Sequence, residues 1–479
     1  MADYDTLLDG MTAASQTTAV PEFLMRVLLS RPVRTNGLRA HKAPLGLRLI
    51  EAALVADGLE RDEVAVVPPE RLPEAIGPAT RAVLVSSGDP LGLGMNDSTM
   101  AALFGGKPYA PIWFERMMLR IEELRGRLPH LHVMFGGPGA WQLAADPAAR
   151  RKLGIDTLFC GYGEKNAASL VGDILAGKRV ASVVTGHVSH AAEVPCILGP
   201  TSMGVVEISR GCGLGCPFCT LRSEPMVHFP IEKIVADVRT NVAGGVVNVC
   251  LISEDFFRYG ADGAKPNPAR VLEMAQAVRQ VSGVRLVQLD HGNVSSVTQF
   301  PPADLKELHD TLTRSVRHEY LWVNIGVETA CGELLDASSC RGKLYPFRPE
   351  EWEQACEQAI CRLVEAGFMP MVSLLVGLPG ETEEHAERTV RLVERLRGRR
   401  LVIFPILYAP LDPGGKAPRR EDLNKHHRDL FRLCYHDFNL KWLRRMIWDN
   451  QAGAGVPFLR RALFQLGGRI QILSLRMPS

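Results

Sequence analysis

The feature that most constrains this chain is an apolar run that leads directly into a cysteine-bearing loop. Residues 204–209 predict a strand, and the Gly-rich loop after it carries Cys212, Cys216 and Cys219 in the spacing C-x3-C-x2-C. Three thiolates on so short a loop can hold three corners of an iron–sulfur cube, and glycines let the backbone wrap closely around an inorganic core. Zinc or reduced structural cysteines are the alternatives. Zinc usually takes four ligands, often from paired C-x2-C knuckles, and the chain has no second knuckle.

The segment Cys212-Gly-Leu-Gly-Cys216-Pro-Phe-Cys219 resembles the signature of the radical S-adenosylmethionine (SAM) superfamily. The resemblance implies that Cys212, Cys216 and Cys219 are the catalytic cysteines and the metal ligands of a 4Fe-4S cluster, whose fourth iron binds the amino and carboxylate groups of SAM. It also implies that the reduced cluster cleaves SAM to a 5′-deoxyadenosyl radical. Phe218 would offer its backbone to the adenine of SAM.

Composition narrows the class of protein. A chain of 479 residues with 46% hydrophobic and 23% charged residues predicts two or three globular domains. The formal net charge of +2 argues against a nucleic-acid partner. No apolar run reaches the roughly eighteen residues of a transmembrane helix. The polar start of the chain does not resemble a secretory signal, and eleven cysteines beside a cluster motif favour a reducing cytoplasm.

Strands alternate with helices between residues 21 and 195, after a loose lead-in expected for residues 1–20. This alternation predicts an α/β domain with a doubly wound parallel sheet. Loops that follow parallel strands lie at one edge of the sheet, where ligands bind. The expected strands are 25–30, 63–67, 82–87, 132–135 and 155–160, and the expected helices are 45–58, 73–76, 112–128 and 166–176.

Three of these post-strand loops carry glycines, and together they resemble the Rossmann-like cobalamin-binding domain that precedes the barrel in one radical SAM class. The D-x-H-x-x-G element that supplies a histidine to cobalt elsewhere is absent, so the corrin is expected base-off. Arg39 and His41 lie on the loop that would face its lower side, with solvated loop residues as the alternative. Ordinary turn glycines are the alternative for the loops. The implied cobalamin contacts are Leu45, Gly46, Ser87, Gly88, Asp89, Gly136, Gly137, Gly161, Gly163 and Glu164.

A second strand–helix repeat over residues 196–420 predicts a partial (β/α)6 TIM barrel. The cysteine loop follows its first strand, and barrel active sites lie at the C-terminal ends of the strands. The expected strands are 204–209, 247–253, 284–290, 321–326, 369–376 and 401–407, and the expected helices are 231–242, 268–281, 302–313, 349–366 and 383–396.

Residues at the ends of the later strands are therefore candidates for the site. A cationic SAM needs carboxylates or carbonyls, although an acidic residue at a strand end can also be a helix N-cap. The candidates for SAM, by resemblance, are Glu254, Gly326, Glu328 and Gly377, the last leaving room for adenine. The candidates for substrate are Asp255, Tyr259, Asp290, His291 and Tyr408.

The pattern changes to longer helices in residues 421–479, with helices expected at 422–445 and 457–476. Basic residues alternate there with large apolar ones such as Trp442 and Trp448. Such a helix either lies on a membrane surface or packs its apolar side on the barrel and solvates its basic side. Among the remaining cysteines, the irregular spacing of Cys331, Cys340 and Cys434 argues against a second cluster.

These observations predict a cobalamin-dependent radical SAM enzyme, a C-methyltransferase acting on an unactivated or weakly activated carbon of a small molecule or peptide. It would need an electron donor of the flavodoxin or ferredoxin type. One alternative is a non-methylating enzyme of the same architecture that catalyses carbon-skeleton, ring or C–C bond chemistry. A methylthiolating enzyme would carry three further cluster cysteines in its first domain, whereas residues 1–195 contain only Cys160. A non-catalytic cobalamin sensor would not need the cysteine set.

Overall fold

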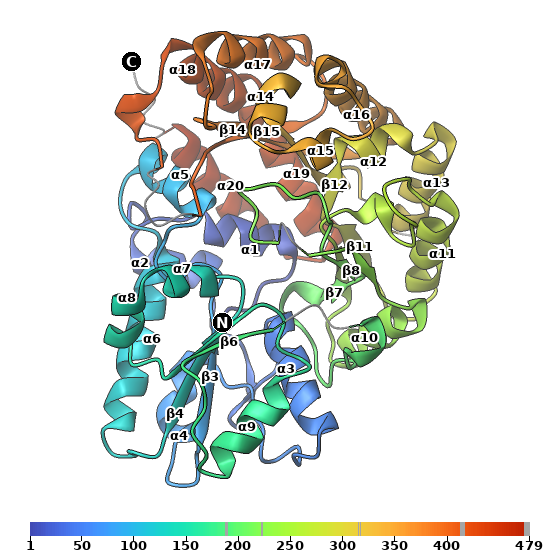
Figure 1. The fold of residues 1–479 in the computed structure, drawn as a ribbon. Coiled ribbons are helices and arrows are strands. Elements are labelled where there is room, and N and C mark those ends of the chain that lie inside the picture. Colours follow the sequence, from blue (N-terminus) through green and yellow to red (C-terminus); the bar gives the residue numbers. More distant parts are fainter. Residues whose placement is uncertain (187–189, 222–223, 315, 317, 412–416, 474–479) are drawn as a thin grey trace.

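The N-terminal part of the chain folds around a parallel sheet of four strands in sequence order. The computed structural model describes all residues except 187–189, 222–223, 315, 317, 412–416 and 474–479. Figure 1 shows this sheet below a second α/β part. The strands are β3 (Ala82–Ser86), β4 (His132–Gly136), β5 (Thr157–Cys160) and β6 (Val183–Thr185).

Helices cover both faces of this sheet. Side chains alternate between the faces along a strand, so Val83 and Val85 pack in one apolar cluster and Leu84 packs in another. The first cluster includes residues of α6 and α7, and the second includes residues of α3 and α9. The bounds of these helices are α3 (Leu45–Ala56), α6 (Tyr109–Arg125), α7 (Ala140–Ala145) and α9 (Ala167–Leu175).

Two predicted strands of this part are wrong. Residues 25–30 contain a π-helical segment, η1 (Met25–Leu29), in which only Met25 is buried. Residues 63–67 form no strand, and the carbonyl of Val66 accepts a hydrogen bond from the Ala40 N–H instead. An apolar run becomes a strand only when neighbouring backbone can complete its ladder. The sheet therefore begins at β3, and its strand order shows no reversal.

The second part contains the six predicted strands in their expected order, and all neighbours pair in parallel. The third is broken at Asp290, whose N–H donates to Leu251 and whose carbonyl accepts from Asn324, so it joins two sheets. Closure of these sheets into a partial barrel stays a prediction. The strands are β7 (Val205–Glu207), β10 (Asn248–Ile252), β11 (Leu286–Leu289), β12 (His291–Asn293), β13 (Trp322–Glu328), β14 (Met369–Val376) and β15 (Val402–Leu407).

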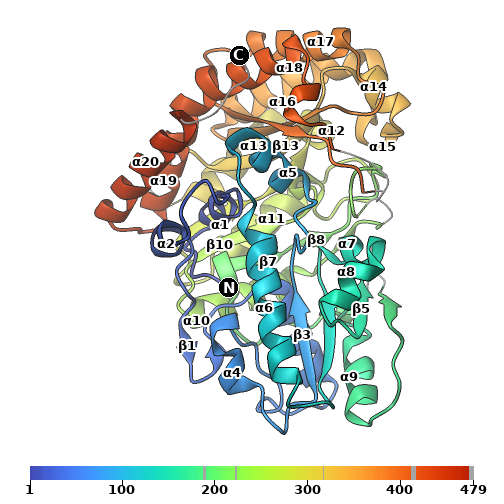
Figure 2. The ribbon, with the colours of Figure 1, turned by 90° about the vertical axis from the view of Figure 1, so that its left-hand side faces the viewer.

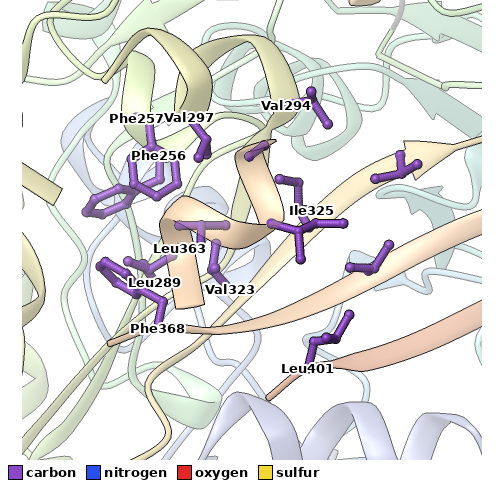
Figure 3. Close-up of a cluster of buried hydrophobic side chains, with 14 of the residues drawn as sticks. Phe256, Phe257, Leu289, Val294, Val297, Val323, Ile325, Leu363, Phe368 and Leu401 are labelled. Atoms are coloured by element: carbon purple, nitrogen blue, oxygen red, sulfur yellow. The ribbon is translucent and has the colours of Figure 1, made fainter. Parts of the chain in front are cut away.

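Apolar side chains from strands and helices fill the space between them. Val323 and Ile325 of β13 lie with Leu363 and Phe368 in the fully buried cluster of Figure 3. The helices between the strands are α10 (Ile231–Ala243), α11 (Pro268–Arg279), α12 (Val294–Gln299), α13 (Pro302–Thr313), α16 (Trp352–Ala366) and α17 (Glu383–Arg395).

The two ends of the described chain pack together. Residues 1–20 are not a loose lead-in, because α1 (Leu7–Ala14) buries Leu8 against α19 (Leu440–Gly453). Gln451 also donates to the buried carboxylate of Asp9 at 2.8 Å. Figure 2 shows α1 beside α19 and α20 (Phe458–Leu473). The last residues of the predicted 457–476 helix lie outside the described residues. No helix in the described part of the chain has the length and apolar character needed to span a membrane.

Candidate cofactor site

A short antiparallel ladder closes the base of the cysteine loop. The strand β8 (Ser209–Arg210) pairs with β9 (Val227–His228), so the loop leaves the sheet and returns beside it. Gly211 has φ +70°, and a Cβ there would overlap the carbonyl oxygen of Pro225. This ladder, which fixes both ends of the loop, was not predicted from the sequence.

The loop itself leaves room for a ligand. A Cβ at Gly213 or Gly215 would meet no atom within 4 Å. The Cys219 N–H donates to the Cys216 carbonyl at 3.0 Å, and Arg258 donates to the Cys212 carbonyl at 3.0 Å. Hydrogen bonds therefore fix the backbone around the thiols, while the space beside Gly213 and Gly215 stays open.

The chemistry of the thiols fits a cluster held through one sulfur per iron. Burial raises the pKa of Cys212 to about 11 and also raises the pKa of Cys219, so the free thiols are protonated. Iron binds thiolates, and loading the site must therefore release protons. In the described part of the chain no group of three His, Cys, Asp or Glu residues is arranged for one metal ion. A 4Fe-4S cluster takes one thiolate at each of three irons, so its three cysteines do not have to surround a single metal position.

A helix distant in sequence packs against the loop. A Cβ at Gly342 in α15 (Arg341–Leu344) would overlap the Leu214 carbonyl. A hydrogen bond with the neighbouring Cys340 thiol raises the pKa of Cys216. The sequence analysis left Cys340 unplaced, because its spacing from the motif gives no signal of this contact.

Glu254 follows β10 and carries a half-buried carboxylate near the cysteine loop. Its Oε2 atom is buried without a hydrogen-bond partner among the described residues. Burial, with a further contribution from the charge of Glu207, raises the pKa of Glu254 to about 7. A carboxylate oxygen that is buried without a partner favours a cationic ligand. The role of Glu254 toward SAM stays a prediction.

The other SAM candidates are already engaged with protein groups. Glu328 forms a buried ion pair with Lys343 at 2.9 Å, and a Cβ at Gly326 would overlap the Glu328 carboxylate. A Cβ at Gly377 would overlap Pro418, so the space expected for adenine beside this glycine is filled. Phe218 lies half-buried beside the apolar core, and its backbone role stays a prediction.

Two substrate candidates are buried. Asp255 is fully buried and accepts a hydrogen bond from Ser296 Oγ at 2.7 Å. Tyr259 is 1% exposed, and its hydroxyl donates to the Phe229 carbonyl at 2.7 Å. Both side chains are buried and hydrogen-bonded within the protein, although Asp255 Oδ2 has no hydrogen-bond partner among the described residues. Their role as substrate contacts stays a prediction that this burial does not favour.

Three substrate candidates stay accessible. Asp290 accepts from Asn324 Nδ2 at 2.6 Å, and its second oxygen lies 2.9 Å from Nδ1 of the exposed His291. Tyr408 is half-buried after β15. Asp290 follows β11 and Tyr408 follows β15, whereas His291 is the first residue of β12. Contact of the three residues with a substrate stays a prediction.

The glycine loops of the N-terminal sheet lie at one edge, as predicted, because β3, β4 and β5 are parallel. Several of their glycines are needed for packing within the protein. A Cβ would overlap Ser86 at Gly137 and the Gly186 carbonyl at Gly161, and would lie 3.0 Å from Ile50 at Gly163. Turn glycines therefore explain part of the pattern.

Other predicted cobalamin residues differ in their surroundings. A Cβ at Gly46 or Gly88 would meet nothing within 4 Å, so these positions border open space. Leu45 packs against the core of the second part. The Asp89 carboxylate accepts from the N–H groups of Leu93 and Gly94 and thereby closes its own loop.

Ser87, Gly136 and Arg39, which were also predicted near cobalamin, contact other residues of the N-terminal part. The Ser87 carbonyl accepts from the Gly139 N–H at 3.0 Å, and Gly136 is in ordinary contact with Phe159. Arg39 donates to the carbonyls of Arg61 and Val64, so its guanidinium is engaged within its own domain.

Arg210 links the two parts of the molecule beside the cysteine loop. Its side chain is 1% exposed and pairs with Glu164 at 3.1 Å and Glu207 at 2.5 Å. The guanidinium also lies 4.3 Å from the centre of the Tyr162 ring. Glu164 was predicted to contact cobalamin, but one of its oxygens is committed to Arg210. The bridge holds the loop after β5 next to the cysteine loop.

Comparison with known families agrees with the cysteine site. Residues 206–393 match the model of the Radical SAM superfamily. This stretch includes the cysteine loop and Glu254, so this part of the chain is a radical SAM domain. A radical SAM domain implies a 4Fe-4S cluster and SAM as cofactors.

Curated relatives that match include proteins named as methylthiotransferases. Ribosomal protein uS12 methylthiotransferase RimO of Anaeromyxobacter sp. (strain Fw109-5) is 29% identical over 301 residues, which are 60% of this chain and 59% of the relative. The tRNA-2-methylthio-N(6)-dimethylallyladenosine synthase of Desulfosudis oleivorans is 22% identical over 322 residues, which are 66% of this chain and 64% of the relative. The chain thus spans about three-fifths of the length of these relatives.

Solved structures show the same fold over a longer stretch. The radical SAM methyltransferase TsrM from Kitasatospora setae, with tryptophan substrate and a SAM analogue bound, has a TM-score of 0.55 at 18% identity, covering 79% of this chain and 74% of TsrM. The TsrM structure with cobalamin and a [4Fe-4S] cluster has a TM-score of 0.53 at 16% identity, covering 78% and 71%. Residues 196–479 are only about three-fifths of the chain, so the similarity must extend into the N-terminal part.

Proposed function

We propose that this protein is a cobalamin-dependent radical SAM enzyme that transfers a methyl group to carbon. The observation that carries the proposal is the Arg210 bridge, which joins a cysteine loop suited to a cluster to the edge of the N-terminal sheet. The shared fold with the TsrM structure that holds cobalamin and a cluster supports it. A Rossmann-like first domain and a partial barrel are parts of the same proposal.

The roles of the chain's own residues follow from their surroundings. Cys212, Cys216 and Cys219 would hold the cluster, and Glu254 would bind the amino group of SAM. Gly88 would leave space for cobalamin. It lies at the edge of the N-terminal sheet that the Arg210 bridge connects to the cysteine loop. When bound, the cluster and SAM supply radical chemistry and cobalamin supplies a methyl carrier.

The substrate and partners are proposed at the level of chemistry. Asp290 and Tyr408, which follow β11 and β15, and His291, which begins β12, would offer a carboxylate, a phenol and an imidazole to a small molecule or a peptide. A flavodoxin- or ferredoxin-type protein in the cytoplasm would supply electrons.

A methylthiotransferase is the second candidate, because several curated relatives carry that name. Transfer of sulfur in that group uses three further cluster cysteines in the first domain, and Cys160 is the single cysteine within residues 1–195. Non-methylating chemistry and a cobalamin sensor are the remaining alternatives.

Anaerobic turnover with methyl-deuterated SAM and a cell extract separates these candidates. We expect products that gain a deuterated methyl group without sulfur. Products that gain a methylthio group would establish the second candidate. Release of 5′-deoxyadenosine without any methyl transfer would establish the non-methylating one, and the absence of any SAM consumption would favour a sensor.

The substitution Glu254→Gln is expected to weaken SAM binding by about 10- to 100-fold above neutral pH, since a hydrogen bond to a charged group contributes about 1.5–3 kcal/mol. Burial raises the pKa of Glu254 to about 7, so the carboxylate is neutral below that pH and charged above it. The affinity of the wild type for cationic SAM should therefore fall as the pH drops through 7. Calorimetric titration across this range measures both effects.

Glu383→Gln is the matched control, because Glu383 is exposed in the first turn of α17. It should keep both the affinity and the pH profile of the wild type. A Glu254→Gln variant that retained the wild-type pH profile would show that another group binds the SAM amino group.

A further inference from the structure

One helix near the C-terminus exposes a stripe of leucines. In α20, Leu459, Leu463 and Leu466 are 70%, 47% and 57% exposed. Their spacing of four and three residues places them on one face of the helix. The opposite side packs on the protein, where Phe464 joins the cluster that includes Leu8 and Met446.

A second segment exposes apolar side chains next to α20. Phe23 and Val27 are 66% and 67% exposed, in α2 (Glu22–Leu24) and η1. The helix α20 contacts η1, and Figure 2 shows α2 near α20 on the same side of the molecule. Seven of the thirteen large hydrophobic side chains exposed in the described chain lie on these segments. Such concentration marks an interaction surface, whereas single exposed residues would not.

A cationic cavity opens at the ends of the same two segments. It has a volume of about 450 Å³ and is bordered by Pro457 at the start of α20 and by residues just after η1. Its lining includes Asp3, Asp5, Arg31, Arg34, Lys42 and Arg460, which carry charge, and His41.

The cations of the cavity outnumber its anions. Lys42 pairs with Asp3 at 2.7 Å, and Arg460 pairs with Asp5. Both aspartates are thereby used, and the described contacts give Arg31 no ion-pair partner. Arg34 is likewise left without an ion pair in the part of the chain that the structure describes. The cavity therefore keeps free positive charge beside the apolar stripe.

We propose that the exposed faces of α2, η1 and α20, together with this cavity, form a docking face for a membrane that contains anionic phospholipids. The leucines of α20 and Phe23 enter the acyl region, and Arg31 and Arg34 bind headgroup phosphates. Apolar side chains beside basic ones are typical of protein segments that lie in the membrane interface. A membrane with anionic lipids can bind both the exposed apolar side chains and the basic side chains of the docking face.

Other occupants would bind either the cationic cavity or the apolar side chains of the docking face, but not both. A free phosphate would fill the cavity and leave the leucines in water. A second copy of the chain would place the same surface on both sides of the interface, since symmetric dimer interfaces are self-complementary. The free arginines of one copy would then lie against those of the other copy. The cavity also borders Gly244 and Gly245, which precede β10, whereas the cysteine loop lies at the opposite ends of the strands. Docking would therefore leave the cofactor site uncovered.

Flotation with lipid vesicles tests this inference on the full chain. The protein should float with vesicles of phosphatidylcholine and phosphatidylglycerol, bind poorly to phosphatidylcholine alone, and be released by salt. The double variant Leu463→Asp/Leu466→Asp should bind at least about tenfold more weakly, because two side chains lose their apolar burial. The double variant Arg31→Gln/Arg34→Gln should bind about 25-fold more weakly, at about fivefold per basic residue.

Two variants control for general effects of charge and polarity. Leu119→Asp changes a leucine that is 59% exposed on α6, and Arg179→Gln changes an exposed arginine after α9. Both should bind vesicles like the wild type. The inference is overturned if wild-type protein stays unbound to anionic vesicles, or if the controls lose as much binding as the docking-face variants. It is also overturned if light scattering shows a dimer that Leu463→Asp/Leu466→Asp dissociates, because a second copy would then be the occupant.

Discussion

Replacement of Cys212, Cys216 or Cys219 by alanine is expected to remove the iron–sulfur cluster and to lower SAM cleavage by at least about a thousandfold, because the cleavage needs an electron from that cluster. We expect these variants to fold, since alanine is smaller than cysteine, the loop borders open space at Gly213 and Gly215, and the β8–β9 ladder fixes the loop ends. Iron and sulfide content after anaerobic reconstitution measures the loss directly.

Cys340→Ala is the sharpest control for this experiment. Its thiol contacts Cys216 but lies outside the motif. We expect this variant to keep the wild-type iron content, because three cysteines suffice for a cluster that leaves one iron to SAM. Loss of iron in Cys340→Ala, with retention in any of the three motif variants, would contradict the assignment of the ligands.

Arg210→Met is expected to destabilise the protein by about 3–5 kcal/mol, the usual cost of leaving a buried charge unpaired. The substitution removes the one partner shared by the buried Glu164 and Glu207. Burial already raises the pKa of Glu207, and loss of the cation removes the interaction that opposes this shift. Chemical unfolding followed by fluorescence and circular dichroism measures the change.

Arg341→Met provides the comparison for Arg210→Met. Arg341 pairs with Asp336, but its side chain is 82% exposed, and exposed pairs contribute only about 0–1 kcal/mol. If both variants lost the same stability, the Arg210 bridge would not be the link that we describe between the cysteine loop and the N-terminal sheet.

Local patterns in the sequence predicted much of the second part. The strand expected at 369–376 is β14, and the helix expected at 231–242 is α10 with one more residue. Long buried apolar runs and amphipathic helices carry their own signal. Residues 25–30 also form an apolar run, but this run is short and only Met25 is buried in η1. The run therefore misled the prediction of a strand.

Contacts between distant segments could not be predicted in the same way. Nothing near Arg210 in the sequence indicates that Glu164 is its partner, and the loop glycine at 377 gives no sign that Pro418 fills the space beside it. The cysteine loop was predictable because its three ligands lie within eight residues. The site around it is assembled from several strands and helices, and its geometry depends on the fold.

The central claim is that one chain holds both a SAM-cleaving cluster and cobalamin. The most direct measurement is gel filtration of protein reconstituted anaerobically with iron, sulfide and cobalamin, followed by metal analysis for iron and cobalt. We expect one 4Fe-4S cluster and one cobalamin on each chain, with cobalt retained when the cluster cysteines are replaced. Protein that binds the cluster but elutes free of cobalt would contradict it.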